Sequence, residues 1–163
     1  IYVDASIFIH AGGMIERIQR FCKATNQTIP TTPGELAQTV FASLALQYTK
    51  TCDDLAQCSK LEMPAIHIVG GGSQNQHLCQ LTADISGKEV IAGPVEATAM
   101  GNAMVQAIAL GKDSNLTDAK SARALISSSD LGVRSFKPTQ GQDQNTIAQI
   151  RARYQKLTLE DMR

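Results

Sequence analysis

Residues 65–75 read AIHIVGGGSQN, and this stretch sets the architecture of the whole chain. Its part 66–69 is typical of a short buried strand, which the glycines 70–72 end, and residues 73–75 then open a helix. Three successive glycines remove every side chain from one turn, so backbone amides can approach a ligand closely. The first N–H groups and the positive end of the helix point at the same place, which favours an anion or a phosphorylated ligand. A tight turn without a ligand is the alternative.

Two better-known phosphate-binding loops do not match these residues. A Walker loop carries Gly-Lys-Ser/Thr, whereas Gly72 is followed by Ser73 and Gln74. A dinucleotide-binding fingerprint needs a glycine where Asn75 stands, and an acidic residue at the end of the next strand, which here ends in Ala92. The turn is therefore neither a P-loop nor a dinucleotide site.

The composition is that of one ordinary domain. The chain has 163 residues, and its 15 Lys and Arg balance its 15 Asp and Glu, so no net charge attracts nucleic acid or an anionic membrane. No apolar run approaches the ~20 residues that a membrane-spanning helix needs. We therefore expect neither a nucleic acid nor a membrane as a partner.

The four cysteines, at positions 22, 52, 58 and 79, lack the C-x-x-C spacing of a zinc site. Reduced structural thiols are the favoured interpretation, and they suit a cytoplasmic protein. The chain begins with Ile1 rather than methionine, and residues 1–10 lack the basic start and the cleavage site of a signal peptide. We expect it to be a piece of a longer protein.

Helical spacing of apolar residues dominates the rest of the chain. The clearest start signal is TPGE at 32–35, in which Thr32 caps, Pro33 takes the first helical position and Glu35 completes a capping box. The inward stripe of this helix is expected to comprise Leu36, Val40, Leu44, Tyr48 and Leu55. The predicted helices cover about 14–26, 33–58, 73–86, 97–110, from 115 or 117 to 126, and the residues after 141–143. The helix 97–110 is rich in small residues, which indicates either close packing against a neighbouring backbone or simple helix propensity.

Two strands are predicted, at 66–69 and 88–92, whereas 136–138 is interpreted as a loop. A strand, a helix and a strand within about thirty residues form a βαβ unit, so the two strands should be parallel. The predicted fold class is α/β, mostly helical with a small parallel sheet. Because two strands do not make an independent sheet, further strands are expected from upstream of Ile1 or from another subunit.

Several segments together resemble the C-terminal domain of the FGGY carbohydrate kinases. They are IHIVGGGSQN at 66–75, LxxLxAD at 78–84 and VIAGPVEA at 90–97, with support from SLALQY at 43–48 and FKP at 136–138. The resemblance covers about residues 8–155. The glycine turn alone marks the wider superfamily, whereas its combination with IAGPVEA singles out the branch of the family that acts on L-rhamnulose.

This resemblance implies the actin-like, ribonuclease-H-like ATPase fold of two lobes, with ATP in the cleft between them. Residues 1–163 would be a partial C-terminal, nucleotide-facing lobe, and an absent N-terminal lobe would bind the sugar and supply the general-base aspartate. The nucleotide-binding residues that it implies are Gly70, Gly71, Gly72, Ser73, Gln74 and Asn75. Gly71 is the expected direct contact, and Asn75 is expected near the adenine, at a helix start that tolerates alanine. The resemblance implies no catalytic or metal-ligating residue in this chain, with ATP as the substrate and Mg²⁺ accompanying it.

Another ketose or polyol as the sugar, and a non-catalytic nucleotide-binding module, are the alternative functions. The expected partners are the absent N-terminal lobe and a small-molecule sugar, with an oligomer left open. Ala42 stands where the family often has an acidic residue, which puts any role of that carboxylate in doubt. Four other polar residues are interpreted as structural or surface groups: His67, His77, Asp84 and Glu96.

Overall fold

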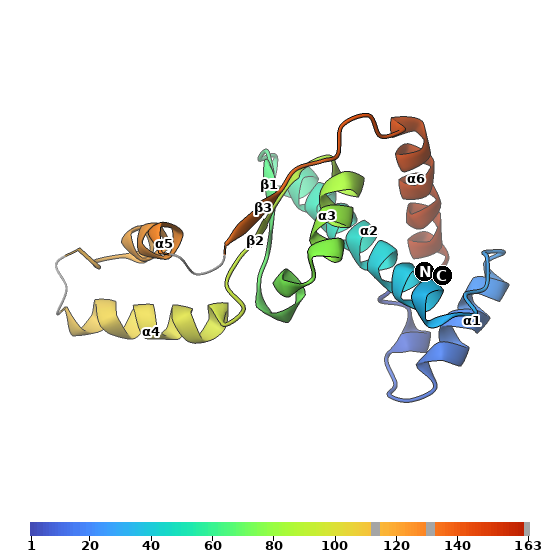
Figure 1. Cartoon of the computed structure of the whole chain (residues 1–163), viewed down its shortest axis with the longest axis horizontal. Coiled ribbons are helices and arrows are strands. Elements are labelled where there is room, and N and C mark those ends of the chain that lie inside the picture. The colour runs from blue at the N-terminus through green and yellow to red at the C-terminus, as the bar shows by residue number, and fades with distance from the viewer. Residues whose placement is uncertain (112–114, 130–132, 162–163) are drawn as a thin grey trace.

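The computed structural model describes residues 1–111, 115–129 and 133–161. Helices dominate it, as predicted (Figure 1). The elements, in chain order, are the 3-10 turn η1 (Ser6–Phe8), α1 (Met14–Ala24), α2 (Pro33–Ser59), β1 (Ala65–Ile68), the 3-10 turn η2 (Gly70–Gln74), α3 (Gln76–Ser86), β2 (Glu89–Ala92), α4 (Ala97–Leu110), α5 (Ala119–Ser128), β3 (Arg134–Phe136) and α6 (Gln144–Asp161). Within the described ranges, no helix is both long and apolar enough to cross a lipid bilayer.

The capping box predicted for α2 is present. The Thr32 hydroxyl accepts a hydrogen bond from the Glu35 N–H at 3.3 Å, and the Glu35 carboxylate accepts from the Thr32 N–H at 3.0 Å. The Thr31 N–H donates to the same carboxylate at 2.7 Å, and the backbone N–H groups of Thr31 and Thr32 lower the pKa of Glu35 to about 2. The helix ends at Ser59, where Lys60 takes the left-handed conformation.

Two helix starts differ from the predictions. The helix α3 begins at Gln76 instead of residue 73, because the residues before it form η2. The helix α5 begins at Ala119, and its cap is Asp118 rather than Asn115 or Thr117. The Asp118 carboxylate accepts from the Ser121 N–H at 2.7 Å, so the capping box lies one residue beyond the predicted start.

The sheet contains three strands among the described residues, in the order β1-β2-β3. The strands β1 and β2 are parallel as predicted, with Ile66 opposite Val90. The strand β3 is antiparallel to β2 and places Phe136 opposite Val90, so the loop predicted at 136–138 starts one residue later, and the strand before it was not predicted. With only three residues, two of them exposed, this strand is too short to show an alternating pattern of apolar and polar residues in the sequence. The sheet is consequently mixed rather than wholly parallel.

Buried side chains form three clusters, each of which includes or contacts residues of α2. In the first, α3 packs on the sheet through Ile68, Cys79, Ala83, Val90 and Ala92. In the second, α2, α3 and α6 meet around Ala45, Leu46, Leu78, Ile85 and Tyr154. In the third, α1 and the first residues pack through Ile1, Ile18 and Cys22 against Leu36 and Val40 of α2. The helix α2 is thus the central support of the fold, as expected from its length.

The predicted stripe of α2 is displaced at its far end. Leu55 was expected inside but is 55% exposed. The residues that α2 buries most completely are Ser43, Ala45, Leu46 and Thr49, half of which are polar. The hydroxyls of Ser43 and Thr49 donate to carbonyls one turn earlier, at 2.6 and 2.8 Å, which lets them lie in an apolar interior. A pattern based on apolar residues alone does not find such positions.

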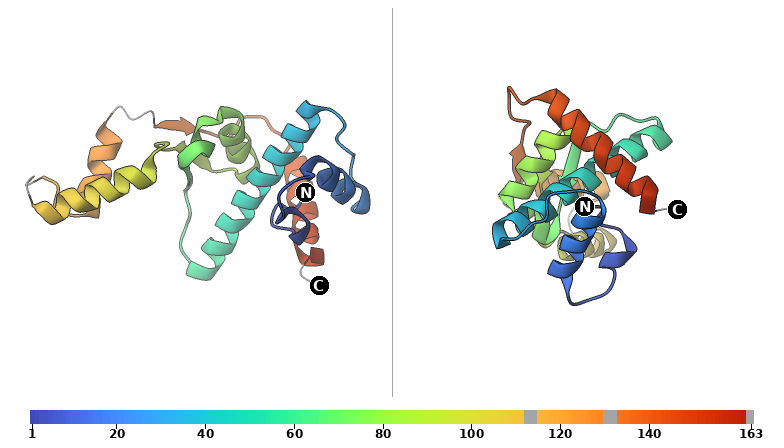
Figure 2. Two further views of the ribbon diagram at one scale, coloured as in Figure 1. Left: turned by 90° about the horizontal axis from the view of Figure 1, so that it is seen from below. Right: turned by 90° about the vertical axis from the view of Figure 1, so that its right-hand side faces the viewer.

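The helices α4 and α5 project away from the sheet, at the end opposite to α1 and α6 (Figures 1 and 2). The bounds of α4 are as predicted, yet none of its residues is buried. Val105 and Leu110 are each 67% exposed. The small residues of α4 therefore make no tight helix packing within the described residues.

Candidate functional site

The glycine stretch forms η2, a separate five-residue turn between β1 and α3. It starts at Gly70 in the left-handed region, with φ +75°, where a side chain would be strained. The Gly70 N–H donates to the Pro94 carbonyl at 3.2 Å, and the Gly93 N–H donates to the Ile68 carbonyl at 2.8 Å. These two bonds continue the pairing of β1 with β2 and fix the start of the turn against the residues that follow β2.

The Gly71 N–H is a backbone donor at the start of this turn. In a 3-10 turn each N–H bonds the carbonyl three residues earlier, so the first N–H groups lack a partner inside the turn. Gly70 finds its partner in Pro94, whereas the Gly71 N–H has none among the residues that the structure describes. Gly71 is exposed, and a Cβ built on it would meet nothing within 4 Å. The turn therefore presents an unsatisfied donor, the Gly71 N–H, at an open position.

Ser73 points into the protein and is only 4% exposed. Its hydroxyl donates to the Gly70 carbonyl at 2.7 Å. The side chain of Gln74, by contrast, is exposed. Both side chains were predicted to face a nucleotide. In the structure Ser73 closes the turn from inside, whereas Gln74 is free to reach outward.

Asn75 is the N-cap of α3. Its side-chain oxygen accepts a hydrogen bond from the Leu78 N–H at 3.0 Å. The expectation that alanine is tolerated at this position was wrong, because alanine would leave that N–H without its acceptor.

Cys79 lies beneath the turn and is completely buried. Its sulfur is 3.9 Å from both the Gly72 and the Ser73 carbonyl oxygens. Burial raises the pKa of the Cys79 thiol, and the weaker effect of Arg134 does not reverse this, so the group is protonated at neutral pH. It therefore acts as a weak S–H donor under the turn.

Three other polar residues lie outside this turn. His67 is exposed on β1. His77 is exposed as well, with its ring 2.8 Å from the Gln38 side chain and edge-on to Phe41. Glu96 occupies the N-cap position of α4, and its side chain makes no capping hydrogen bond there.

Asp84 connects α3 to the segment between β3 and α6. Its carboxylate accepts from the Thr139 N–H at 2.8 Å and from the Gln80 amide at 2.9 Å. Burial alone would raise the pKa of Asp84, but the hydrogen bonds from Thr139, Gln80 and Gln142 outweigh it and lower the pKa. The residue holds the return of the chain in place, a structural role of the kind expected.

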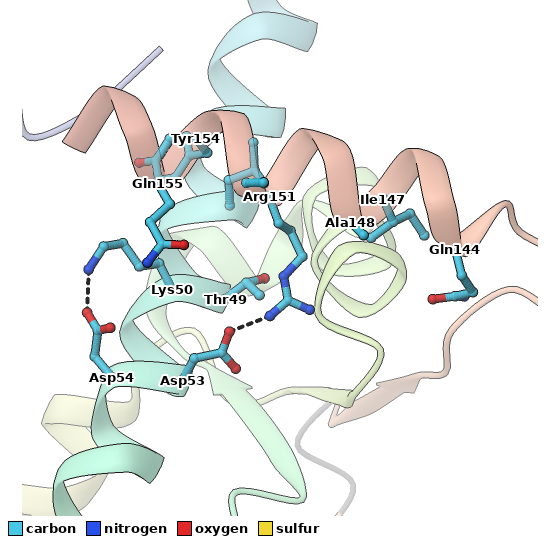
Figure 3. Close-up of a pocket in the computed structure, with 12 residues that line it drawn as sticks. Thr49, Lys50, Asp53, Asp54, Gln144, Ile147, Ala148, Arg151, Tyr154 and Gln155 are labelled. Atoms are coloured by element: carbon cyan, nitrogen blue, oxygen red, sulfur yellow. Dashed lines mark hydrogen bonds and ion pairs between the residues drawn. The ribbon is translucent and has the colours of Figure 1, made fainter. Parts of the chain in front are cut away.

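A cavity of about 360 Å³ lies elsewhere, between α2 and α6 (Figure 3). Its charged groups pair with each other: Lys50 lies 2.5 Å from Asp54, and Arg151 contacts Asp53. Asp53 and Arg151 lie on opposite walls of the cavity and are 98 residues apart in the chain, so no local sequence pattern predicts this cavity. It does not include any residue of the glycine turn.

The described part of the chain holds no group of three or more His, Cys, Asp or Glu residues that could bind a metal ion.

The sequence matches the model of the FGGY family of carbohydrate kinases, C-terminal domain, over residues 3–110. That range includes the glycine turn and α1 to α4. Among curated proteins, the chain is 44% identical to a rhamnulokinase of Oceanobacillus iheyensis over 124 residues, which cover 76% of this chain and 26% of that protein. It is 44% identical to a rhamnulokinase of Enterococcus faecalis over 131 residues, or 79% of this chain and 26% of that protein. It is 41% identical to a rhamnulokinase of Bacillus subtilis over 142 residues, or 87% and 28%.

The chain spans about a quarter of the length of these relatives. The family match covers more than half of this chain, and it includes the segments that carried the resemblance in the sequence, except for 136–138. The chain belongs to the FGGY family of carbohydrate kinases, and it carries sequence of that family's C-terminal domain.

Proposed function

We propose that this chain is the nucleotide-facing part of an ATP-dependent rhamnulokinase, which transfers the γ-phosphoryl group of ATP to L-rhamnulose and forms L-rhamnulose 1-phosphate and ADP. The observation that carries this proposal is the identity of 41–44% to three proteins named rhamnulokinase over most of this chain. The whole of residues 1–163 is then part of the C-terminal lobe of a two-lobed kinase. The sugar site and the general base belong to an N-terminal lobe.

The turn 70–75 is the proposed nucleotide site. Phosphoryl transfer depends mainly on positioning and on electrostatic stabilisation of the phosphate oxygens. The unsatisfied Gly71 N–H is a donor of the kind that such oxygens accept, and it lies where no side chain obstructs approach. Gly70 supplies the left-handed start of the turn, while Gln74 is exposed and can reach the nucleotide. Gly72, Ser73 and Asn75 complete the turn.

Mg²⁺ is expected to accompany ATP, and it supplies charge neutralisation between phosphate oxygens. The described residues hold no cluster that could bind a metal ion, and none of them is proposed as a ligand of this Mg²⁺.

We propose that the rest of the lobe packs against two surfaces that are exposed in this chain, the apolar side of α4 and one face of the sheet. Val105 and Leu110 of α4 are each 67% exposed, which is unusual for large apolar side chains on one helix. One sheet face packs on α3, whereas the opposite face carries His67, Ile91 and Ser135 in one row across the strands. We place the kinase in the cytoplasm, which agrees with four unpaired cysteines.

The test is a coupled ADP-release assay on the longer protein that contains this chain, with L-rhamnulose and with other ketoses and polyols. Preferred turnover of L-rhamnulose is the expected result. Preferred turnover of another sugar would support the kinase activity and correct the substrate. Nucleotide binding without phosphoryl transfer would instead indicate a non-catalytic module. The 163-residue chain by itself should give no sugar-dependent turnover, because the general base lies elsewhere and its loss alone costs about 10²–10⁴-fold.

A further inference from the structure

The Ser73 hydroxyl and the Gly71 N–H act on opposite sides of one peptide group. Ser73 Oγ donates to the carbonyl oxygen of Gly70 at 2.7 Å, and that carbonyl shares its peptide bond with the nitrogen of Gly71. The described residues contain no cis peptide bond, and a trans peptide is planar with its C=O and N–H pointing in opposite directions. A hydroxyl that holds the carbonyl inward therefore holds the N–H outward.

This peptide group needs such a restraint more than most. It lies between Gly70 and Gly71, and neither residue has a Cβ to limit rotation of the plane. Gly70 is anchored on its other side by the bond from its N–H to the Pro94 carbonyl. Within the 3-10 turn the Ser73 N–H bonds the Gly70 carbonyl, and the Ser73 hydroxyl adds a second hydrogen bond to the same oxygen, which further prevents the carbonyl from turning toward the place that a phosphate would occupy.

The burial of Ser73 excludes a second role at the surface. The residue is only 4% exposed, and its hydroxyl hydrogen is already used in the bond to Gly70. A hydrogen bond to a peptide carbonyl also polarises the N–H of the same group and makes it a better donor.

We propose that Ser73 is a positioning residue, which keeps the Gly71 N–H directed at the phosphate groups of a bound nucleotide without touching the nucleotide itself. This inference rests on the proposed function, and it names which part of the ligand the turn recognises. The adenine and ribose do not depend on the Ser73 hydroxyl.

The experiment compares inhibition of the longer kinase by ADP and by adenosine, which lacks phosphates. For Ser73→Ala we expect the inhibition constant of ADP and the KM of ATP to rise about fivefold, since the hydrogen bond that orients the peptide group between Gly70 and Gly71 is lost. The inhibition constant of adenosine and the KM of the sugar should change less than about twofold. Ser73→Thr keeps the hydroxyl and should restore ADP binding.

Ser86→Ala is the matched control. Ser86 is also buried, and its hydroxyl also donates to a carbonyl three residues earlier, that of Ala83 at 3.4 Å, but it lies at the far end of α3. This variant should lower the melting temperature and leave the inhibition constant of ADP unchanged.

Equal losses of ADP and adenosine binding in Ser73→Ala, or no loss of either, would overturn the inference. Should that variant not fold, the backbone amide resonance of Gly71 in the wild-type protein decides. It must shift on addition of ADP and not of adenosine, and a Gly71 resonance that ignores ADP would overturn the inference as well. A wild-type protein that binds neither ligand and phosphorylates no sugar would instead remove the proposed function.

Discussion

The side-chain oxygen of Asn75 lies 3.0 Å from the backbone nitrogen of Leu78 and caps the helix that follows the glycine turn. Asn75→Ala should therefore lower the free energy of unfolding by about 0.5–2 kcal/mol. Asn75→Asp and Asn75→Ser retain an acceptor and should keep most of the stability. Urea unfolding of the four proteins measures this. Gln76→Ala, at the exposed next position, is the control and should change stability by less than about 0.5 kcal/mol. An alanine variant at position 75 as stable as wild type would show that the cap contributes nothing.

Gly71→Val should weaken ATP binding without weakening the fold. Its φ lies outside the left-handed region, and an added Cβ meets nothing within 4 Å, so the melting temperature should stay within about 2 °C of wild type. In the longer kinase the KM of ATP should rise strongly, because the side chain would occupy the space of the nucleotide, while the KM of the sugar should change little.

Gly34→Ala is the control for Gly71→Val. Gly34 also has no atom within 4 Å of an added Cβ, but it lies in the first turn of α2. This variant should keep the KM of ATP. A folded Gly71→Val protein with an unchanged KM of ATP would reduce Gly71 to a turn residue and contradict the proposed nucleotide site.

Asp84 should make stability depend on pH in the acid range. Its pKa is lowered from the ordinary value of 3.8 in the folded protein, so the ionised form is favoured by folding. That stabilisation is complete above pH 3.8 and is lost as the pH falls through the lower, folded-state pKa. Asp84→Asn has no charge to titrate, so the advantage of wild type over this variant should be largest at neutral pH and should shrink below pH 3.8. Denaturation midpoints of wild type and Asp84→Asn, measured between pH 7 and pH 2, test this prediction. The other acidic groups are the same in both proteins, so their contribution cancels in the difference between the two midpoints. A constant difference across that range would contradict the prediction.

The helix α6 should be held by Tyr154 rather than by its ion pair. Tyr154 is only 3% exposed, and its hydroxyl donates to Gln47 at 2.8 Å, so Tyr154→Ala should cost about 3–5 kcal/mol. Arg151 and Asp53 are 38% and 44% exposed, and a pair so open to solvent contributes about 0–1 kcal/mol. Chemical denaturation and limited proteolysis of Tyr154→Ala and Arg151→Ala would separate the two. Equal losses would mean that the ion pair matters more than its exposure indicates.

The elements with strong local signals were predictable from the sequence. The capping box of α2 and the ends of α3 at residue 86 and of α4 at residue 110 lie where predicted, and a left-handed glycine follows each of those two ends, so each signal is complete within a few residues. The strand β3 was missed because its pairing with β2 joins segments more than forty residues apart. The stripe of α2 was displaced because buried Ser43 and Thr49 satisfy their hydroxyls on their own helix.

The position of the glycine turn could be predicted from the sequence, but the hydrogen bonds of the side chains within it could not. The three glycines between a strand and a helix indicated the turn, and Gly71 was singled out within it. The roles of its neighbours are visible only in the structure, since whether Ser73 points inward depends on the 3-10 geometry and on the space above Cys79. The capping role of Asn75 follows from α3 starting at Gln76, a boundary shift of three residues.

The three buried clusters share one helix, and this has a consequence for how the chain unfolds. Leu36 and Val40 of α2 pack in the cluster with α1, Leu46 lies in the cluster with α6, and Tyr48 contacts both that cluster and the one beneath the sheet. Tyr48 thus joins two of the clusters, and the third packs on the preceding part of the same continuous helix. On heating or in denaturant, α1, α3, α6 and the sheet should therefore unfold together, as one cooperative unit. The glycine turn is attached to α3, so it should stay ordered until that whole unit unfolds.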